Sequence, residues 1–210
     1  MDKMLKFVND PLFLALIVFI LLFLLFDILK RLGRGRAWKQ IAADTGLQFS
    51  KHKTATYRDQ QLSGTYRKRP LAIIESVSGY YLAEQRRNWD RNTHTDTDIR
   101  MKINIPAGYK MGLNRVLTIG EGTYVTGNAE IDRNFNITSE PNWLAPKVLA
   151  SPTVQQKLRG LKMGSSIFVQ DATILFHQNG RISDGNYLRL LLDFLGDFAD
   201  IVEAAATEAL

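Results

Sequence analysis

Three residues with metal-ligating side chains follow one another at alternate positions, His94, Asp96 and Asp98. On a β-strand such residues point to one face, and a histidine with two carboxylates can hold a divalent cation. The alternation continues beyond the trio, so a half-buried strand explains more positions than a metal site does. We therefore predict a half-buried strand and no bound metal. The trio remains the weak candidate set of metal ligands in this sequence. The trio's face adds Arg100, Lys102 and Asn104, and the other face carries Thr95, Thr97, Ile99, Met101, Ile103 and Ile105.

Aromatic and arginine side chains alternate in the segment between residues 79 and 92. This composition is typical of a loop or short helix that contacts anionic headgroups, phosphates or a partner protein. The alternative is a solvated connection whose aromatic rings pack on the edge of a sheet. The residues concerned are Tyr80, Tyr81, Arg86, Arg87 and Trp89.

Motifs of the common catalytic and cofactor-binding classes are missing from the sequence. The chain has no cysteine, which excludes disulfides, thiol catalysis and Cys-ligated metals. The glycine-punctuated stretch from Gly112 to Gly127 fits neither G-x-G-x-x-G nor a P-loop, and it is interpreted as a hairpin turn. No G-x-S-x-G occurs. We therefore predict no cofactor, and His177 is interpreted as structural.

The last helix is predicted from Tyr187 to about Ala206, because apolar residues recur there at helical spacing. An acidic row lies opposite the apolar stripe, at positions 193, 197 and 200, and is interpreted as a solvated face rather than a site for a metal or a basic partner. Leu190, Phe194 and Ile201 widen the apolar face on one flank. One sheet would not cover all of that face, so this trio is a candidate contact for an oligomer or partner.

The amino-terminal region predicts a transmembrane anchor over residues 11–30. Positions 12 to 26 contain no polar side chain, and eighteen residues up to Leu29 would form a helix of about 27 Å, close to a hydrocarbon core of about 30 Å. Basic residues follow the span, which predicts the cytoplasmic side there and residues 1–10 outside the cell. The prediction is thus a single-pass signal anchor in the plasma membrane.

Residues 31–46 are predicted to form a basic juxtamembrane hinge at Gly33 and Gly35, followed by a short helix from about Ala37. Trp38 would lie either at the headgroups or beneath the domain. The candidate contacts with an anionic leaflet or a partner are Lys30, Arg31, Arg34, Arg36, Trp38 and Lys39. Basic residues are concentrated up to position 115, with 18 basic and 7 acidic side chains between residues 30 and 115. A basic half of this kind suits an anionic surface or an acidic partner.

Residues 47–210 are predicted to form one cytoplasmic α+β domain. Short runs rich in β-branched residues indicate an antiparallel sheet of about six to eight strands, covered on one face by carboxy-terminal helices. The chain is therefore interpreted as a membrane-anchored binding, scaffold or accessory-subunit protein, with an anionic leaflet and a protein partner or second copy as its partners. The alternative is a membrane-surface enzyme acting on an anionic lipid or phosphorylated substrate, using Arg86 and Arg87 with acids such as Asp132 or Asp171. Nucleic acid is not expected, because the basic residues fit no nucleic-acid motif.

Overall fold

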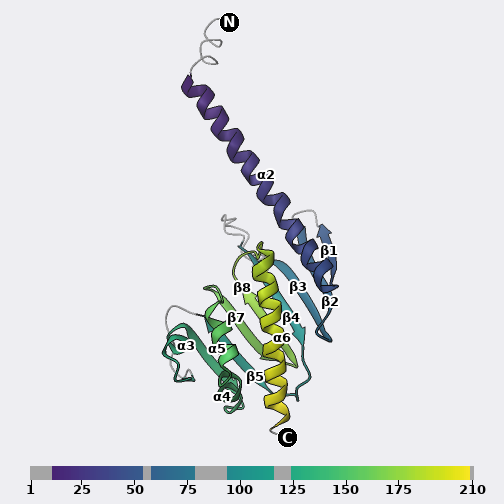
Figure 1. Cartoon of the computed structure of the whole chain (residues 1–210), viewed down its shortest axis with the longest axis vertical. Helices are drawn as coiled ribbons and strands as arrows, with labels where there is room; N and C mark the ends of the chain where they lie inside the picture. The colour runs from purple at the N-terminus through teal and green to yellow at the C-terminus, as the bar shows by residue number, and fades with distance from the viewer. Residues whose placement is uncertain (1–10, 54–57, 79–93, 116–123, 209–210) are drawn as a thin grey trace, which may run out of the picture.

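The computed structural model describes residues 11–53, 58–78, 94–115 and 124–208 (Figure 1). Their centre is one eight-stranded sheet in the order β1-β2-β3-β4-β8-β7-β5-β6, and every strand pair in it is antiparallel. The strands are β1 (Gln48–Lys53), β2 (Arg58–Tyr66), β3 (Arg69–Ser78), β4 (His94–Lys102), β5 (Lys110–Arg115), β6 (Phe135–Glu140), β7 (Ser165–Gln170) and β8 (Thr173–Gln178).

Helices pack on one face of this sheet. The longest of them, α6 (Gly185–Thr207), lies across the strands in Figure 1, with α4 (Leu144–Leu149) and α5 (Pro152–Arg159) beside it. The short α3 (Ala129–Asn134), which the sequence did not predict, begins at Asn128, whose side chain accepts the N–H groups of Glu130 and Ile131. The interpretation of 112–127 as a hairpin turn is wrong at its start, because Gly112 lies within β5.

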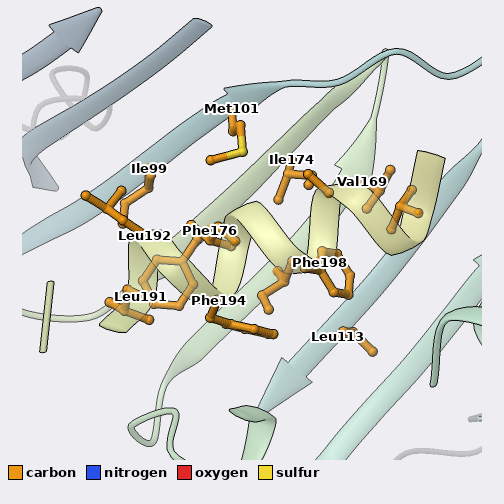
Figure 2. Packing of buried hydrophobic residues seen from close by; sticks show 14 of the residues in the cluster. Ile99, Met101, Leu113, Val169, Ile174, Phe176, Leu191, Leu192, Phe194 and Phe198 are labelled. Carbon is orange, nitrogen blue, oxygen red and sulfur yellow. The ribbon is translucent and has the colours of Figure 1, made fainter. Parts of the chain in front are cut away.

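Alternation along the strands decides which side chains form the core. In β8, Ile174 and Phe176 are buried against the helices, and Leu175 and His177 on the other face are only half-buried. Figure 2 shows side chains from four strands meeting Leu191, Phe194 and Phe198 of α6. Replacing a buried phenylalanine of such a core by alanine typically lowers the free energy of unfolding by about 3–5 kcal/mol.

Two tight turns have backbone conformations that the sequence did not reveal. Asp171 and Ala172 join β7 to β8 with φ values of 51° and 53°, as a two-residue hairpin turn with both central residues at positive φ requires. Arg67 and Lys68 join β2 to β3 in the same way, with φ values of 47° and 66°. The pattern of residues 166–177 fits either one long strand or a hairpin; the structure has the hairpin, formed by β7 and β8, and its turn lies before the Asn179-Gly180 dipeptide.

The first helix, α2 (Pro11–Thr45), runs for 35 residues without a break. It passes through Gly33 and Gly35, where the sequence predicted a hinge. A glycine lowers helix stability by about 1 kcal/mol but does not forbid the helical conformation. The helix ends before Gly46, whose φ is +73°.

The carboxy-terminal end of α2 belongs to the core of the domain. Trp38 is 1% exposed, Ile41 is also buried, and the indole N–H of Trp38 donates to the carbonyl oxygen of Ile182 at 2.9 Å. Of its two expected positions, Trp38 therefore occupies the one beneath the domain. It is not an exposed contact residue.

The predicted transmembrane anchor at residues 11–30 is contradicted. Among the described residues, no helix combines the length and the apolar character that crossing a membrane requires; a span takes about 20 consecutive apolar residues. The fold class predicted from the sequence is therefore wrong in its first part. The same finding overturns the single-pass topology, the amino-terminus outside the cell and the plasma-membrane location. The apolar side chains between Leu16 and Phe26 are exposed along α2.

Replacing Trp38 by phenylalanine should destabilise the domain, because the buried carbonyl of Ile182 loses its donor. We expect W38F to lower the free energy of unfolding by about 1–2 kcal/mol, measured by urea denaturation. Trp143 offers a matched control, since it is half-buried against Tyr109 and its indole N–H donates to no described acceptor. Equal losses in W38F and W143F would contradict a specific role for the Trp38 hydrogen bond.

Candidate functional site

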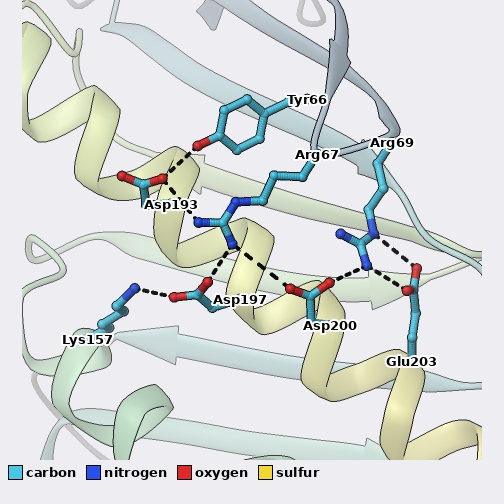
Figure 3. Close-up of polar contacts among 8 residues, drawn as sticks. All are labelled: Tyr66, Arg67, Arg69, Lys157, Asp193, Asp197, Asp200 and Glu203. Atoms are coloured by element: carbon cyan, nitrogen blue, oxygen red, sulfur yellow. Dashed lines mark hydrogen bonds and ion pairs between the residues drawn. The ribbon is translucent and has the colours of Figure 1, made fainter.

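The carboxylates of α6 form a row along one side of the helix. Asp193, Asp197, Asp200 and Glu203 recur at intervals of three or four residues, so they lie one above another. The helix is fixed at its start by Asp184, whose side chain accepts the N–H groups of Asn186 and Tyr187. Since the apolar stripe of the same helix is buried on the sheet, the acidic row is held beside the end of the sheet where β2 turns into β3 (Figure 3).

The β2–β3 turn presents its cations to this row. Hairpin turns with two positive φ values usually contain Asn-Gly, and two long side chains there cost of order 1 kcal/mol or more each. In return, Arg67 donates from Nη1 to Asp197 Oδ1 at 2.5 Å and from Nη2 to Asp193 Oδ1 at 3.2 Å. Gly196 makes room for this, because a Cβ there would lie 2.7 Å from Arg67 Cδ.

Tyr66 and Arg69 flank Arg67 on the two strands and reach the same helix. The hydroxyl of Tyr66 donates to Asp193 Oδ1 at 2.7 Å, and burial together with this bond raises the pKa of Tyr66 to about 12. Arg69 donates from Nε and Nη2 to the two oxygens of Glu203 at 3.1 and 2.6 Å, and from Nη2 to Asp200 Oδ1 at 2.6 Å. The bond from Arg69 lowers the pKa of Glu203 and raises that of Arg69 itself.

Lys157 on α5 joins the row from the other side and pairs with Asp197. Burial raises the pKa of Asp197, but Lys157 and Arg67 outweigh burial, so the net shift is downward. We call this cluster the charged seam. Its members are Tyr66, Arg67, Arg69, Lys157, Asp193, Asp197, Asp200 and Glu203 (Figure 3).

The chemistry of the charged seam is that of a structural ion-pair network. Each carboxylate in it accepts from a cation, and wherever a carboxylate pKa shifts, it shifts downward. The lowered pKa values of Asp197 and Glu203 are shifted away from neutrality, the opposite of what a carboxyl group needs for general acid–base catalysis at neutral pH. The seam joins α6, α5 and the β2–β3 turn through these ion pairs.

Two grooves lie beside the seam and share Arg67. The first, of about 510 Å³, lies between the turn, the end of β4 and the last turns of α6. The second, of about 630 Å³, lies between the turn, the end of α2 and the first half of α6. The first is lined by Arg67, Lys68, Arg69, Pro70, Lys102, Ile103, Asn104, Asp200 and Glu203. The second is lined by Asp44, Thr45, Thr65, Tyr66, Arg67, Arg189 and Asp193.

A histidine–carboxylate pair lies on the sheet face opposite the helices. Asp98 and His177 are directly opposite each other on β4 and β8, and His177 Nδ1 lies 2.8 Å from Asp98 Oδ1. The other ring nitrogen, Nε2, lies 3.1 Å from Asn179 Oδ1. Burial alone would lower the pKa of His177, but the hydrogen bonds to Asp98 and Asn179 outweigh it and raise the pKa above 6.5.

Two residues of the candidate metal trio, Asp96 and Asp98, bind other groups in the structure. Asp98 is bound to His177, and Asp96 is buried and accepts the N–H of Gly180 at 3.3 Å. The side chain of His94 lies outside the described residues. Among those described, no three or more His, Asp or Glu side chains are placed to hold a metal ion.

Of the remaining sequence candidates, the structure describes the side chains of Leu190, Phe194, Ile201 and Lys39. Leu190 is 67% exposed but Phe194 is 3% exposed, and Ile201 is half-buried against the core, so these three do not form one exposed flank. Lys39 is exposed near the end of α2. The side chains of Lys30, Arg31, Arg34 and Arg36, and the whole of Tyr80, Tyr81, Arg86, Arg87 and Trp89, lie outside what the structure describes.

Sequence reasoning located the acidic row but missed the cations that meet it. Arg67 and Arg69 come from a part of the chain about 130 residues earlier. The one local signal was the Arg-Lys-Arg-Pro run between two strand patterns, where a tight turn with Asn or Gly is usual.

Comparisons with known proteins add a likeness in fold. No family model matches the chain, and no curated protein matches it. A solved structure, the crystal structure of the mycobacterial trehalose monomycolate transport factor A, TtfA, aligns with a TM-score of 0.50 and 10% sequence identity. The alignment covers 80% of this chain and 96% of that one. At this identity the likeness concerns the fold alone.

The coupling between Arg69 and Glu203 should be measurable, because both side chains are largely shielded, at 14% and 24% exposed. We expect a double-mutant cycle of R69Q and E203Q to give a coupling of about 1–2 kcal/mol in the free energy of unfolding. The Lys110–Glu140 pair is 57% and 69% exposed, and the same cycle there should give at most about 0.5 kcal/mol. Similar couplings for the two pairs would show that the seam does not act as a shielded network.

The raised pKa of His177 should make stability depend on pH. A group with a higher pKa in the folded chain stabilises it fully below the unfolded pKa, about 6.5, and this contribution is lost as the pH rises through the folded pKa. We therefore expect wild-type stability to fall over that interval more than the stability of D98N, which keeps the histidine without its partner. Chemical denaturation at a series of pH values tests this. An unchanged pH profile in D98N would assign the dependence to another group.

Proposed function

We propose that the chain is a binding or accessory protein that recruits a protein partner through the sheet face opposite α6. The general part of this proposal, a binding or accessory role, is consistent with the likeness in fold to a protein described as a transport factor. The choice of surface rests on the sheet, because the described helices cover one of its faces and leave the other without a helix (Figure 1).

The observation that supports this surface most is a row of residues crossing it. Ala72, Arg100, Leu175 and Phe168 are successive cross-strand neighbours on β3, β4, β8 and β7. Phe168 is 36% exposed on the surface, and Ala72 and Leu175 are half-buried. A row that combines an arginine, an aromatic ring and smaller apolar groups has the composition found at the centre of protein interfaces.

Arg100 defines what the partner should present. It is exposed, and among the described residues it has no acidic neighbour within ion-pair distance. An arginine at the centre of an interface is costly when buried without a partner and favourable when a carboxylate meets it. The proposed partner is therefore a protein surface with an apolar centre and an acidic side chain opposite Arg100.

The enzymatic alternative gains no support from the acids suggested for it. Asp132 accepts the N–H and hydroxyl of Thr126, both at 2.7 Å, and the N–H of Gly127 at 3.0 Å, so its two oxygens hold a loop. Asp171 lies in the β7–β8 turn. Neither residue lines the two grooves beside the charged seam.

The test is affinity purification of the tagged full-length chain with three charge variants. We expect F168E and R100E to lose one stoichiometric partner that the wild type retains, because each places a mismatched charge in the interface. L190E is the matched control for F168E, since Leu190 is an exposed apolar side chain on α6, on the other side of the sheet. Circular dichroism checks that all three variants fold.

A partner lost in L190E but retained in F168E and R100E would contradict the proposal and move the interface to α6. A wild-type preparation that contains only further copies of the chain, with dissociation in F168E, would make the occupant a second copy. Retention of the same partner by all three variants would exclude the sheet face opposite α6 as the interface.

A further inference from the structure

The first groove beside the charged seam contains cations that the protein itself does not neutralise. Among the described residues, Lys68 has no hydrogen-bond or ion-pair partner, and Lys102 donates only to the neutral hydroxyl of Thr173, at 2.9 Å. With Arg67 and Arg69, these lysines place four cations around the groove against two carboxylates, Asp200 and Glu203. We propose that this groove binds a small anion carrying phosphate or carboxylate groups, independently of the partner surface.

The two carboxylates of the groove do not oppose such a ligand. Glu203 accepts from both Nε and Nη2 of Arg69 and also from the backbone N–H of Asn104 at 2.8 Å. Asp200 accepts from Arg69 and lies 3.9 Å from Arg67 Nη1. The negative charge of these two carboxylates is thus neutralised by the arginines. The positive charge that remains at the groove is that of Lys68 and Lys102.

Arg69 leaves one edge of its guanidinium available. Its Nε and Nη2 bind the α6 carboxylates, whereas Nη1 donates to no acceptor among the described residues (Figure 3). A guanidinium held on one side by carboxylates is already oriented when a ligand arrives, so little side-chain freedom is lost on binding. This edge can supply two N–H donors to a phosphate or carboxylate.

The β2–β3 turn determines where Lys68 lies. Lys68 has a φ of 66°, a left-handed conformation that lysine rarely adopts. Here it places a lysine at the rim of the groove, beside the Arg67 that is fixed against α6.

The size of the groove limits the ligand. Its volume of about 510 Å³ lies within the range of small-molecule sites, about 300–1,000 Å³. Its lining also includes the apolar residues Pro70 and Ile103. The chemical class is therefore a compact anion, such as a phosphorylated or polycarboxylate small molecule, with space for a short apolar part.

The test is isothermal titration calorimetry of the full chain with inorganic phosphate and, separately, citrate, at low ionic strength. We expect saturable binding of at least one probe, weakened about fivefold by K68Q and about fivefold by K102Q, as one exposed ion pair supplies, and weakened further in the double variant. Affinity should fall with added sodium chloride, because exposed charges are screened. Phosphate binding with no citrate binding identifies the ligand group as phosphate, and the reverse identifies carboxylate.

K110Q is the matched control, because it removes the same charge at the same end of the sheet, where Lys110 pairs with Glu140 outside the groove. It should leave the affinity unchanged. Equal weakening by K110Q would show attraction by net charge alone and overturn the site. The absence of saturable binding of both probes at millimolar concentrations would overturn it as well.

Discussion

The packing of α6 across the sheet is the constraint on which the rest of the structure depends. Phe198 and Leu195 of this helix are fully buried, and so are Ile99 and Phe176 of the strands beneath it. Burial of one helical face sets the rotation of the helix about its axis. That rotation fixes the direction of every other side chain on α6. The acidic row is therefore held beside the β2–β3 turn. The charged seam is therefore a consequence of the apolar packing.

The charged seam in turn determines which cations remain available. Arg67 and Arg69 are held by carboxylates, and Lys157 meets Asp197 from α5. The seam links α5, α6 and the β2–β3 turn, and the structural cost of two left-handed residues in that turn is offset by these bonds. Lys68 lies in the same turn, yet α6 offers it no acid. Neutralised and unneutralised cations thus lie next to each other in the same turn.

Much of the domain was predictable from local sequence patterns, and the errors have physical reasons. Period-2 alternation predicted β4, and period-3.6 spacing predicted α6, because each pattern reports the burial of one face by its own segment. The Asp171–Ala172 turn was not located because aspartate alone is a weak turn signal and alanine rarely adopts a positive φ, so the pairing of the flanking strands decides where the turn lies. Hydropathy at residues 11–30 predicted a transmembrane anchor that the structure contradicts, and two glycines predicted a hinge inside a continuous helix.

The candidate site was only half predictable, because its two halves come from distant parts of the chain. Asp193, Asp197 and Asp200 could be placed on one helical face from their spacing, but spacing says nothing about what that face meets. A solvated row and a row bound to arginines have the same local sequence. The same limit applies to Asp98, whose spacing from Asp96 suggested a metal. Its actual neighbour, His177, is 79 positions away.

Arginine side chains have different surroundings on the two faces of the sheet. On the helix face, Arg67 and Arg69 are paired with carboxylates of α6. These ion pairs help to fix the position of α6 on the sheet. On the opposite face, Arg100 lies between Ala72 and Leu175 in cross-strand register, where apolar neighbours offer no hydrogen-bond acceptor. An arginine in such surroundings stays hydrated in the free protein. In the proposed complex it exchanges that hydration for a carboxylate of the partner, whereas the cations of the charged seam find their carboxylates within the fold.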